Sequence, residues 1–174
     1  MAKSEFSHMV DLKAIDARVR HLEADETERA ALAARFGLVA IDRLCADVEL
    51  SADGACADAR GTLEADIVQV CAVSGEDLPV HIREDLALRF VPASEDEAVP
   101  DEEVELEEGE LDEIPYTGRS FDLGEAIAQS LALAIDPYAT GPEADKARKE
   151  AGLLDEESAG PFGALAALKG LKKD

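Results

Sequence analysis

The sequence predicts an α+β fold in which an antiparallel β-sheet, or a partly open barrel, is packed by two main helices. Three observations lead to this class. Apolar and polar residues alternate with period two in several segments joined by short turns. Two further segments have apolar residues at helical spacing behind a capping residue, and a long acidic stretch separates the second of them from the strands. The sequence also predicts a long acidic loop within this fold and a short helix at its C-terminal end.

The N-terminal region begins with a predicted strand over residues 6–12. Residues 19–23 are predicted to form a strand beside it, although Ile15, Val19 and Leu22 also fit a helical stripe. The strand is the preferred interpretation, and the helix stays open as the alternative.

Residues 25–37 predict a helix from its two ends. Asp25 and Glu28 have the spacing of a capping box, and Gly37 stands where a left-handed C-cap belongs. Leu32 and Phe36 lie one turn apart, which gives the helix an apolar side.

Three strands joined by short turns are then expected, as an antiparallel meander. They cover residues 43–50, 63–71 and 81–91. Asp53–Gly54 supplies the hairpin signal between the first two, and residues 74–77 supply the second turn.

Residues 93–113 contain many carboxylates and no lysine or arginine. Like charges at this density resist packing, which predicts a solvated loop. The alternatives are a docking surface for a basic partner, or carboxylates that bind a metal or act in catalysis. A mobile loop lacks the fixed geometry that catalysis needs, and the EF-hand spacing is absent. The carboxylates expected to meet a partner are Glu102, Glu103, Glu105, Glu107 and Glu108.

A second helix is predicted to start after Asp122 and to end before Pro137. Asp122 and Glu125 have capping-box spacing, while Ile127 and Leu131 belong to an apolar stripe that Leu133 widens. Residues 1–138 therefore read as one α+β domain.

The C-terminal part is predicted to be a flexible charged connection over residues 139–160, followed by an amphipathic helix or docking motif over residues 161–173. The expected contact residues of this motif are Phe162, Leu165, Leu168, Lys169 and Lys172. The lysines favour either a helix C-terminus or contact with a phosphate backbone, so direct RNA binding stays open.

Composition limits the function classes. The chain has 174 residues and a formal net charge of −23, which disfavours a broad nucleic-acid groove and favours basic partners. The sequence shows no signal peptide or membrane span, so we expect a cytoplasmic protein. Cys45, Cys56 and Cys71 lack CxxC spacing, which argues against a disulfide framework or zinc site.

No motif in the chain names a reaction. His8, His21 and His81 are far apart and form no HExxH pattern, and neither GxSxG, GxGxxG nor a P-loop is present. We therefore expect no catalytic residues, no cofactor and no metal. A nuclease that uses the acidic run remains the enzymatic alternative.

Four segments together resemble the YceD family of large ribosomal RNA subunit accumulation proteins. They are ERAALAARFGL (28–38), which is similar to the alphaproteobacterial type, IVQVCAVSGEDLPVHIREDLALRFVP (67–92), FDLGEAIAQSLALAIDPY (121–138) and PFGALAALK (161–169). Many relatives carry C-x-x-C where this chain has Cys71 and Ser74, so the resemblance does not extend to a metal or redox role for that pair.

The resemblance implies a bacterial, non-enzymatic factor that supports normal levels of 23S ribosomal RNA. Its partner would be a basic ribosomal protein or the precursor particle of the large subunit. The alternative is an acidic adaptor unrelated to ribosomes.

Overall fold

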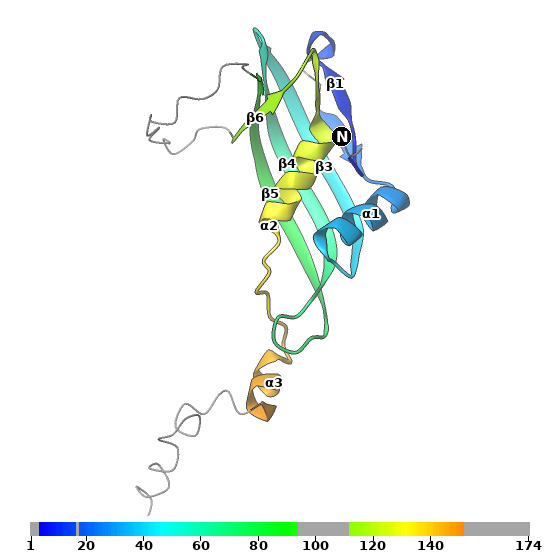
Figure 1. Ribbon diagram of the computed structural model, residues 1–174, viewed down its shortest axis with the longest axis vertical. Coiled ribbons are helices and arrows are strands. Elements are labelled where there is room, and N and C mark those ends of the chain that lie inside the picture. Colours follow the sequence, from blue (N-terminus) through cyan, green and yellow to red (C-terminus); the bar gives the residue numbers. More distant parts are fainter. Residues whose placement is uncertain (1–3, 17, 94–111, 152–174) are drawn as a thin grey trace, which may run out of the picture. The chain divides into compact units, whose positions relative to one another are not determined.

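The computed structural model describes residues 4–16, 18–93 and 112–151 (Figure 1). The chain divides into two compact units. The first comprises residues 1–68 and 79–135, and the second comprises residues 69–78 and 136–174.

Most of the elements belong to the first unit. In chain order they are β1 (Met9–Asp11), the 3₁₀ turn η1 (Leu12–Ala14), β2 (Arg20–Glu23), α1 (Glu26–Phe36), β3 (Ala40–Asp53), β4 (Cys56–Val70), β5 (Asp77–Pro92), β6 (Asp112–Tyr116), β7 (Ser120–Asp122) and α2 (Leu123–Ala134). The helix α3 (Ala144–Glu150) belongs to the second unit.

The strands form a five-stranded sheet in the order β2-β3-β4-β5-β6 and a two-stranded sheet of β1 and β7. Pairing is antiparallel between β2 and β3, between β3 and β4, and between β1 and β7. Both N-terminal strands are confirmed, and the helical alternative for residues 19–23 is wrong. The expected pairing of the two strands is also wrong, because β1 pairs with β7 and β2 pairs with β3. The hairpin signal at Asp53–Gly54 is also confirmed, since Asp53 pairs with Cys56 and Gly54 has a φ of 62°.

Side-chain pairs show the direction of β5 against β4. His81 contacts Asp66 at 2.7 Å, Arg83 contacts Glu64 at 2.7 Å, and Arg89 contacts Asp58 at 3.0 Å. Residue numbers rise along β5 as they fall along β4, which is the signature of antiparallel neighbours.

The β5–β6 pair corrects the expectation of a purely antiparallel sheet. It is parallel, with Leu88 opposite Asp112 and Pro92 opposite Tyr116, so the five-stranded sheet is mixed. The two sheets do not close into a barrel. Asp112 and Glu113, which the sequence assigns to the acidic loop, lie in β6.

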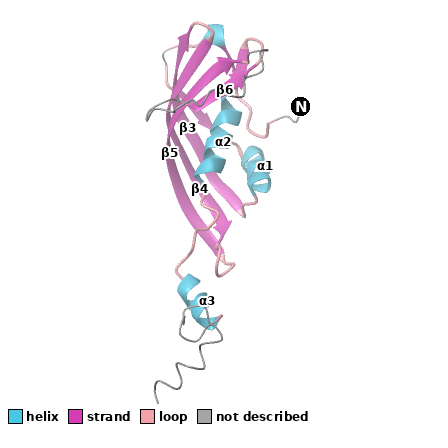
Figure 2. Cartoon of the chain, turned by 60° about the vertical axis from the view of Figure 1, so that its left-hand side comes forward, coloured by secondary structure: helices cyan, strands magenta, loops and turns pink. Residues whose placement is uncertain are grey.

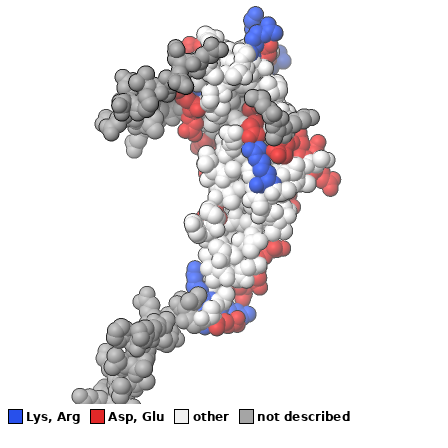
Figure 3. All heavy atoms as spheres, viewed as in Figure 1, with Lys and Arg blue, Asp and Glu red and all other residues white. Residues whose placement is uncertain are grey.

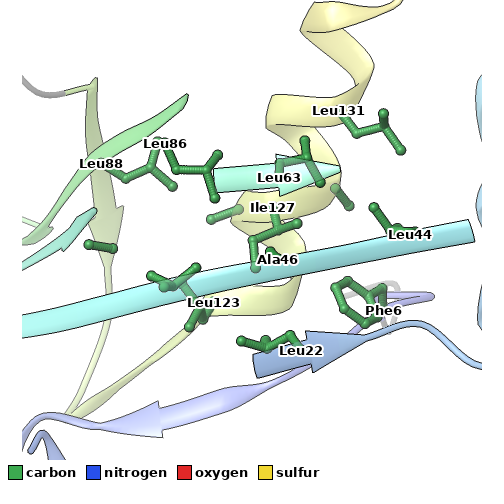
Figure 4. Packing of buried hydrophobic residues seen from close by; sticks show 14 of the residues in the cluster. Phe6, Leu22, Leu44, Ala46, Leu63, Leu86, Leu88, Leu123, Ile127 and Leu131 are labelled. Atoms are coloured by element: carbon green, nitrogen blue, oxygen red, sulfur yellow. The ribbon is translucent and has the colours of Figure 1, made fainter. Parts of the chain in front are cut away.

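Both main helices of the first unit cover the same face of the five-stranded sheet (Figure 2). The close view shows Leu123, Ile127 and Leu131 of α2 directed at apolar side chains of the strands (Figure 4). The largest side chains that are fully buried are Phe6, Leu32, Leu44, Val48, Leu50, Leu63, Ile67, Phe90, Leu123, Ile127 and Leu131. Burial of aliphatic and phenyl groups between one sheet face and two helices therefore forms the core.

The first helix matches its predicted ends. Asp25 and Glu28 form a reciprocal capping box, with both hydrogen bonds at 2.9 Å, and Gly37 adopts the left-handed conformation at a φ of 68°. These contacts satisfy backbone groups that a helix end otherwise leaves unpaired.

The second helix differs from its prediction in two respects. Asp122 accepts from the Glu125 backbone N–H at 3.2 Å, but the Glu125 carboxylate does not return the bond because it binds Arg35. Leu133, expected to widen the buried stripe, is 85% exposed because α2 turns it away from the sheet.

The second unit contains a turn at residues 71–76 and the helix α3. The sequence predicts a charged connection over residues 139–160, and within it Ala144–Glu150 are helical. Residues 161–173, predicted as an amphipathic helix, lie outside the described residues.

Candidate interaction surfaces

The residues predicted to contact a partner lie outside the described part of the chain. This applies to the five glutamates of the acidic segment and to the apolar and lysine residues of the C-terminal motif. The structure does describe the strands on both sides of the acidic segment, β5 and β6, so the candidate surface is built from them.

Aromatic contacts hold both ends of the acidic segment to the core. The Phe90 ring of β5 stacks on Phe121 of β7 with centroids 3.9 Å apart, and Phe121 also meets Tyr116 of β6 edge-on. The Tyr116 hydroxyl donates to the Ala55 carbonyl in the β3–β4 turn. The segment therefore leaves and re-enters a firmly packed part of the sheet.

A groove lies beside this place, between β5, the start of β6 and the C-terminal half of α2. It has a volume of about 210 Å³ and is lined by Glu84, Asp85, Leu86, Ala87, Leu88, Asp112, Ser130, Leu133 and Ala134. Leu86 and Leu88 are buried and form an apolar floor, while Leu133 stands exposed at the rim. The groove thus combines an apolar surface with carboxylates at its edge.

The carboxylates of this groove are not neutralised by neighbouring cations. Within the described ranges, Glu84, Asp85 and Asp112 have no ion pair, whereas the nearby Arg83 is already paired with Glu64. On the face drawn in Figure 3 most described atoms are neither acidic nor basic, and both acidic and basic atoms lie in separate groups. A cation that approaches the groove meets charges that are still available for pairing.

A second hollow of about 350 Å³ separates β1 from β2. Its lining includes Met9, Val10, Arg20 and Leu22. His8 also lines it, and the His8 Nε2 atom is buried without a hydrogen-bond partner among the described residues. The ring of His8 packs edge-on against Phe6, with centroids 4.7 Å apart. Packing against Phe6 is enough to explain the burial of His8, so no functional role is assigned to this histidine.

An ion pair joins α1 to α2. The Arg35 guanidinium donates to both carboxylate oxygens of Glu125, at 2.8 and 3.0 Å, and also to Glu5 at 3.0 Å. Ser4 and Gln129 donate to the same Glu125 carboxylate. The bond from Arg35 is the main cause that lowers the pKa of Glu125 to about 2, and the same pairing raises the pKa of Arg35.

Acid should therefore lower the free energy of unfolding, because protonation of Glu125 breaks its ion pair with Arg35. Because its folded pKa lies below the unfolded value of about 4.3, the stabilisation is present above that value and is lost as the pH falls toward 2. The partly exposed pair is screened, so we expect a loss of about 1–2 kcal/mol. Urea unfolding between about pH 6 and pH 2 measures it.

The matched variants are Arg35→Ala and Arg43→Ala. Arg35→Ala should flatten this part of the acid dependence, whereas Arg43→Ala, which removes a more exposed pair with Glu64 at 3.4 Å, should leave it intact. Equal acid profiles in the parent protein and in Arg35→Ala would contradict the assignment.

Cys71 occupies the turn of the second unit. Its Sγ accepts from the backbone N–H of Gly141 at 3.3 Å and of Ser74 at 3.4 Å, and the side chain is 3% exposed. These bonds, with that from Gly141 as the largest cause, lower the pKa of the thiol to about 6. Ser74 thus lowers the pKa of the Cys71 thiol through both its side chain and its main chain, and all three cysteines are free thiols.

Some classes of site are absent from the described ranges. No group of three or more histidine, cysteine or acidic side chains within them is arranged to hold a metal ion. His21 pairs with Asp47 at 2.8 Å and with Glu23 at 3.9 Å, and His81 pairs with Asp66 at 2.7 Å, so each imidazole lies beside carboxylates. None of the helices in this part of the chain is long and apolar enough to cross a membrane.

The groove residues were not singled out from the sequence. Glu84 and Asp85 stand within a strand-forming run, and Leu133 was expected to widen the buried stripe of the helix. The available signal was Glu84, a carboxylate at a position that shares a strand face with the buried Ile82 and Leu86.

Comparison with known proteins adds one match. Residues 59–172 match the family model described as large ribosomal RNA subunit accumulation protein YceD. The match begins in β4 and extends through β5, β6, β7, α2 and α3 to the C-terminal motif. No curated protein and no solved structure matches the chain.

Proposed function

Because the chain belongs to the YceD family of large ribosomal RNA subunit accumulation proteins, we propose that it is a non-enzymatic factor in large ribosomal subunit biogenesis in the bacterial cytoplasm. It supports accumulation of 23S ribosomal RNA by binding a basic ribosomal protein or the assembling particle. The observation that carries this proposal is the family match, which covers more than half of the chain, and the family description names no reaction.

Charge supports a basic protein as the direct partner. A net charge of −23 speeds encounter with a cationic protein and slows encounter with RNA. The contacts proposed for the acidic segment are Glu102, Glu103, Glu105, Glu107 and Glu108, and those proposed for the C-terminal motif are Phe162, Leu165, Leu168, Lys169 and Lys172. The acidic segment shields the partner's cations while the C-terminal motif docks on the particle.

The test is the ratio of 23S to 16S ribosomal RNA in a strain that lacks the protein. We expect a selective fall in 23S ribosomal RNA, and the intact gene should restore its level.

A second test uses the purified protein and the basic ribosomal proteins of the large subunit. The affinity between them should fall about tenfold or more between low and physiological salt.

Two results would contradict the proposal. An unchanged 23S to 16S ratio would remove the role in large-subunit biogenesis and favour an adaptor of another pathway. If the affinity for basic ribosomal proteins does not change with salt concentration, the charge-based mechanism is contradicted and the biogenesis role is not.

A further inference from the structure

A further groove lies within the first unit, between α1 and the beginning of β3. It has a volume of about 480 Å³. Its lining consists of Glu26, Arg29, Ala30, Ala33 and Ala34 of the helix and of residues 38–42, which follow it. Figure 1 shows the chain passing from α1 directly into β3. Residues 18–93 are described without a gap, so both walls of this α1–β3 groove and the segments that join them are known.

The α1–β3 groove exists because β2 ends before the beginning of β3 is reached. Residues 20–23 pair with residues 45–48, and the Ala24 N–H donates to the Leu44 carbonyl at 3.0 Å. The chain then enters α1 at the Asp25 cap. The residues that would extend β2 along β3 therefore leave the sheet as a helix.

The shape of the groove suits a helix better than a strand. Ile41 is buried at its floor, and Val39 is 49% exposed. Ala30 and Ala34 are exposed and lie one turn apart on α1, so the backbone of an approaching helix can come close. The register of β3 shifts between Ile41 and Arg43, and such a bulge twists a strand edge and disfavours the addition of another strand.

Carboxylates stand at the rim of the groove. Glu26 and Asp42 line it and are exposed, and neither has an ion pair with another residue of the described ranges. The one cation of the lining, Arg29, donates to the Ala24 carbonyl at 2.7 Å, which holds its guanidinium at the end of β2. The rim therefore attracts cations. The net charge of −23 repels a second copy of the chain, so a basic partner is the favoured occupant.

We propose that the α1–β3 groove binds an amphipathic helix of a basic partner protein. Small side chains of that helix pack against Ala30 and Ala34, and an aliphatic side chain covers Val39. Lysine or arginine side chains of the helix pair with Glu26 and Asp42. This inference deepens the proposed function and rests on it for the identity of the partner as a basic ribosomal protein.

The probe is a synthetic peptide of leucine, alanine and lysine, about 18 residues long so that it can form a helix in water. Leucine and alanine occupy one side of this helix, and lysine occupies the other. A peptide of the same composition with the leucines distributed around the helix keeps the charge but loses the apolar side. Fluorescence anisotropy with the full chain should show at least about tenfold tighter binding of the amphipathic peptide. Equal affinities would reduce the interaction to general charge attraction and overturn the proposal.

Ala34→Arg places a long cationic side chain in the groove. The matched control is Thr27→Arg, which adds the same charge at an exposed position of α1 that does not line the groove. Ala34→Arg should weaken binding of the amphipathic peptide about tenfold or more, whereas Thr27→Arg should weaken it less than about threefold. Equal effects of the two variants would contradict the site.

A second pair of variants tests the rim and decides the matter if Ala34→Arg unfolds the protein. Glu26→Gln removes a carboxylate of the groove, and Glu49→Gln removes an exposed carboxylate of β3 outside it. Glu26→Gln should weaken the peptide about threefold more than Glu49→Gln does. Equal losses would contradict the proposed pairing. No binding to the intact chain also overturns the proposal, whether a second copy or the chain's own residues 152–174 cover the groove.

Complementation separates this inference from the proposed function. If a deletion strain has low 23S ribosomal RNA and Ala34→Arg restores it fully, the groove is contradicted and the biogenesis role stands. If the deletion strain has normal 23S ribosomal RNA, the biogenesis role is contradicted, and peptide binding still decides whether the groove accepts a helix.

Discussion

Replacing Gly61 by alanine should destabilise the protein by about 3 kcal/mol or more, because the new methyl group has no space. Gly61 lies in β4 opposite Val48 of β3. An added Cβ would lie 1.9 Å from the Asp47 carbonyl oxygen and 2.9 Å from the Val48 Cα. Both are main-chain atoms of the paired strand, so relief requires separation of β3 from β4. Urea unfolding gives the free energy.

Gly37→Ala is the matched control. Gly37 has a φ of 68°, and an added Cβ would meet no atom within 4 Å. Only the left-handed conformation opposes alanine there, at a cost of about 1 kcal/mol. Equal losses at Gly61 and Gly37 would show that the β3–β4 contact adjusts without cost, contrary to the expected clash.

Phe121→Ala should cost about 3–5 kcal/mol, the range for loss of a buried phenyl group. Phe121 is 2% exposed, stacks on Phe90 and pairs in the main chain with Val10. Its removal leaves a cavity where the small sheet meets the β5–β6 end of the large one. Thermal and urea unfolding should both record the loss, as a single transition at lower stability.

Phe121→Leu keeps much of the volume and should cost about 1–2 kcal/mol. If leucine and alanine destabilise equally, the ring stack with Phe90 carries the energy and the cavity does not. The leucine variant also gives a folded protein in which the anchoring of β6 is weakened.

Local signals predicted the elements whose cause is local. Asp25, Glu28 and Gly37 define α1 through hydrogen bonds and a backbone conformation within a few residues, and these were readable from the sequence. Asp53–Gly54 likewise defined the hairpin. Such features depend on neighbours along the chain, so they can be predicted where no distant residue competes for the same groups.

The differences from prediction arise where distant residues decide. Glu125 has capping-box spacing, but Arg35 of another helix binds its carboxylate. Leu133 was expected to widen the apolar stripe, yet α2 turns it away from the sheet and leaves it exposed. The parallel pairing of β6 depends on where a strand returns after residues 93–111, and the alternation of β6 itself carries no direction.

In the candidate surface too, some features could be predicted from the sequence and others depend on residues far apart in the chain. The excess of acid was evident from composition, and the family resemblance was confirmed. The parallel register of β5 and β6 could not be predicted, because it depends on how the chain returns to the sheet after residues 93–111. A register is a relation between two strands, and neither strand's sequence contains it alone.

The parallel β5–β6 pair sets a minimum on the number of residues between these strands. The chain leaves β5 at Pro92, opposite the end of β6, and must return to Asp112, opposite Leu88. That return covers roughly 13 Å along the strand direction, at about 3.3 Å per residue. Residues 93–111 exceed what this span needs. The return therefore requires a certain number of residues and not their charge, so exchange of the glutamates should leave the topology of the sheet unchanged.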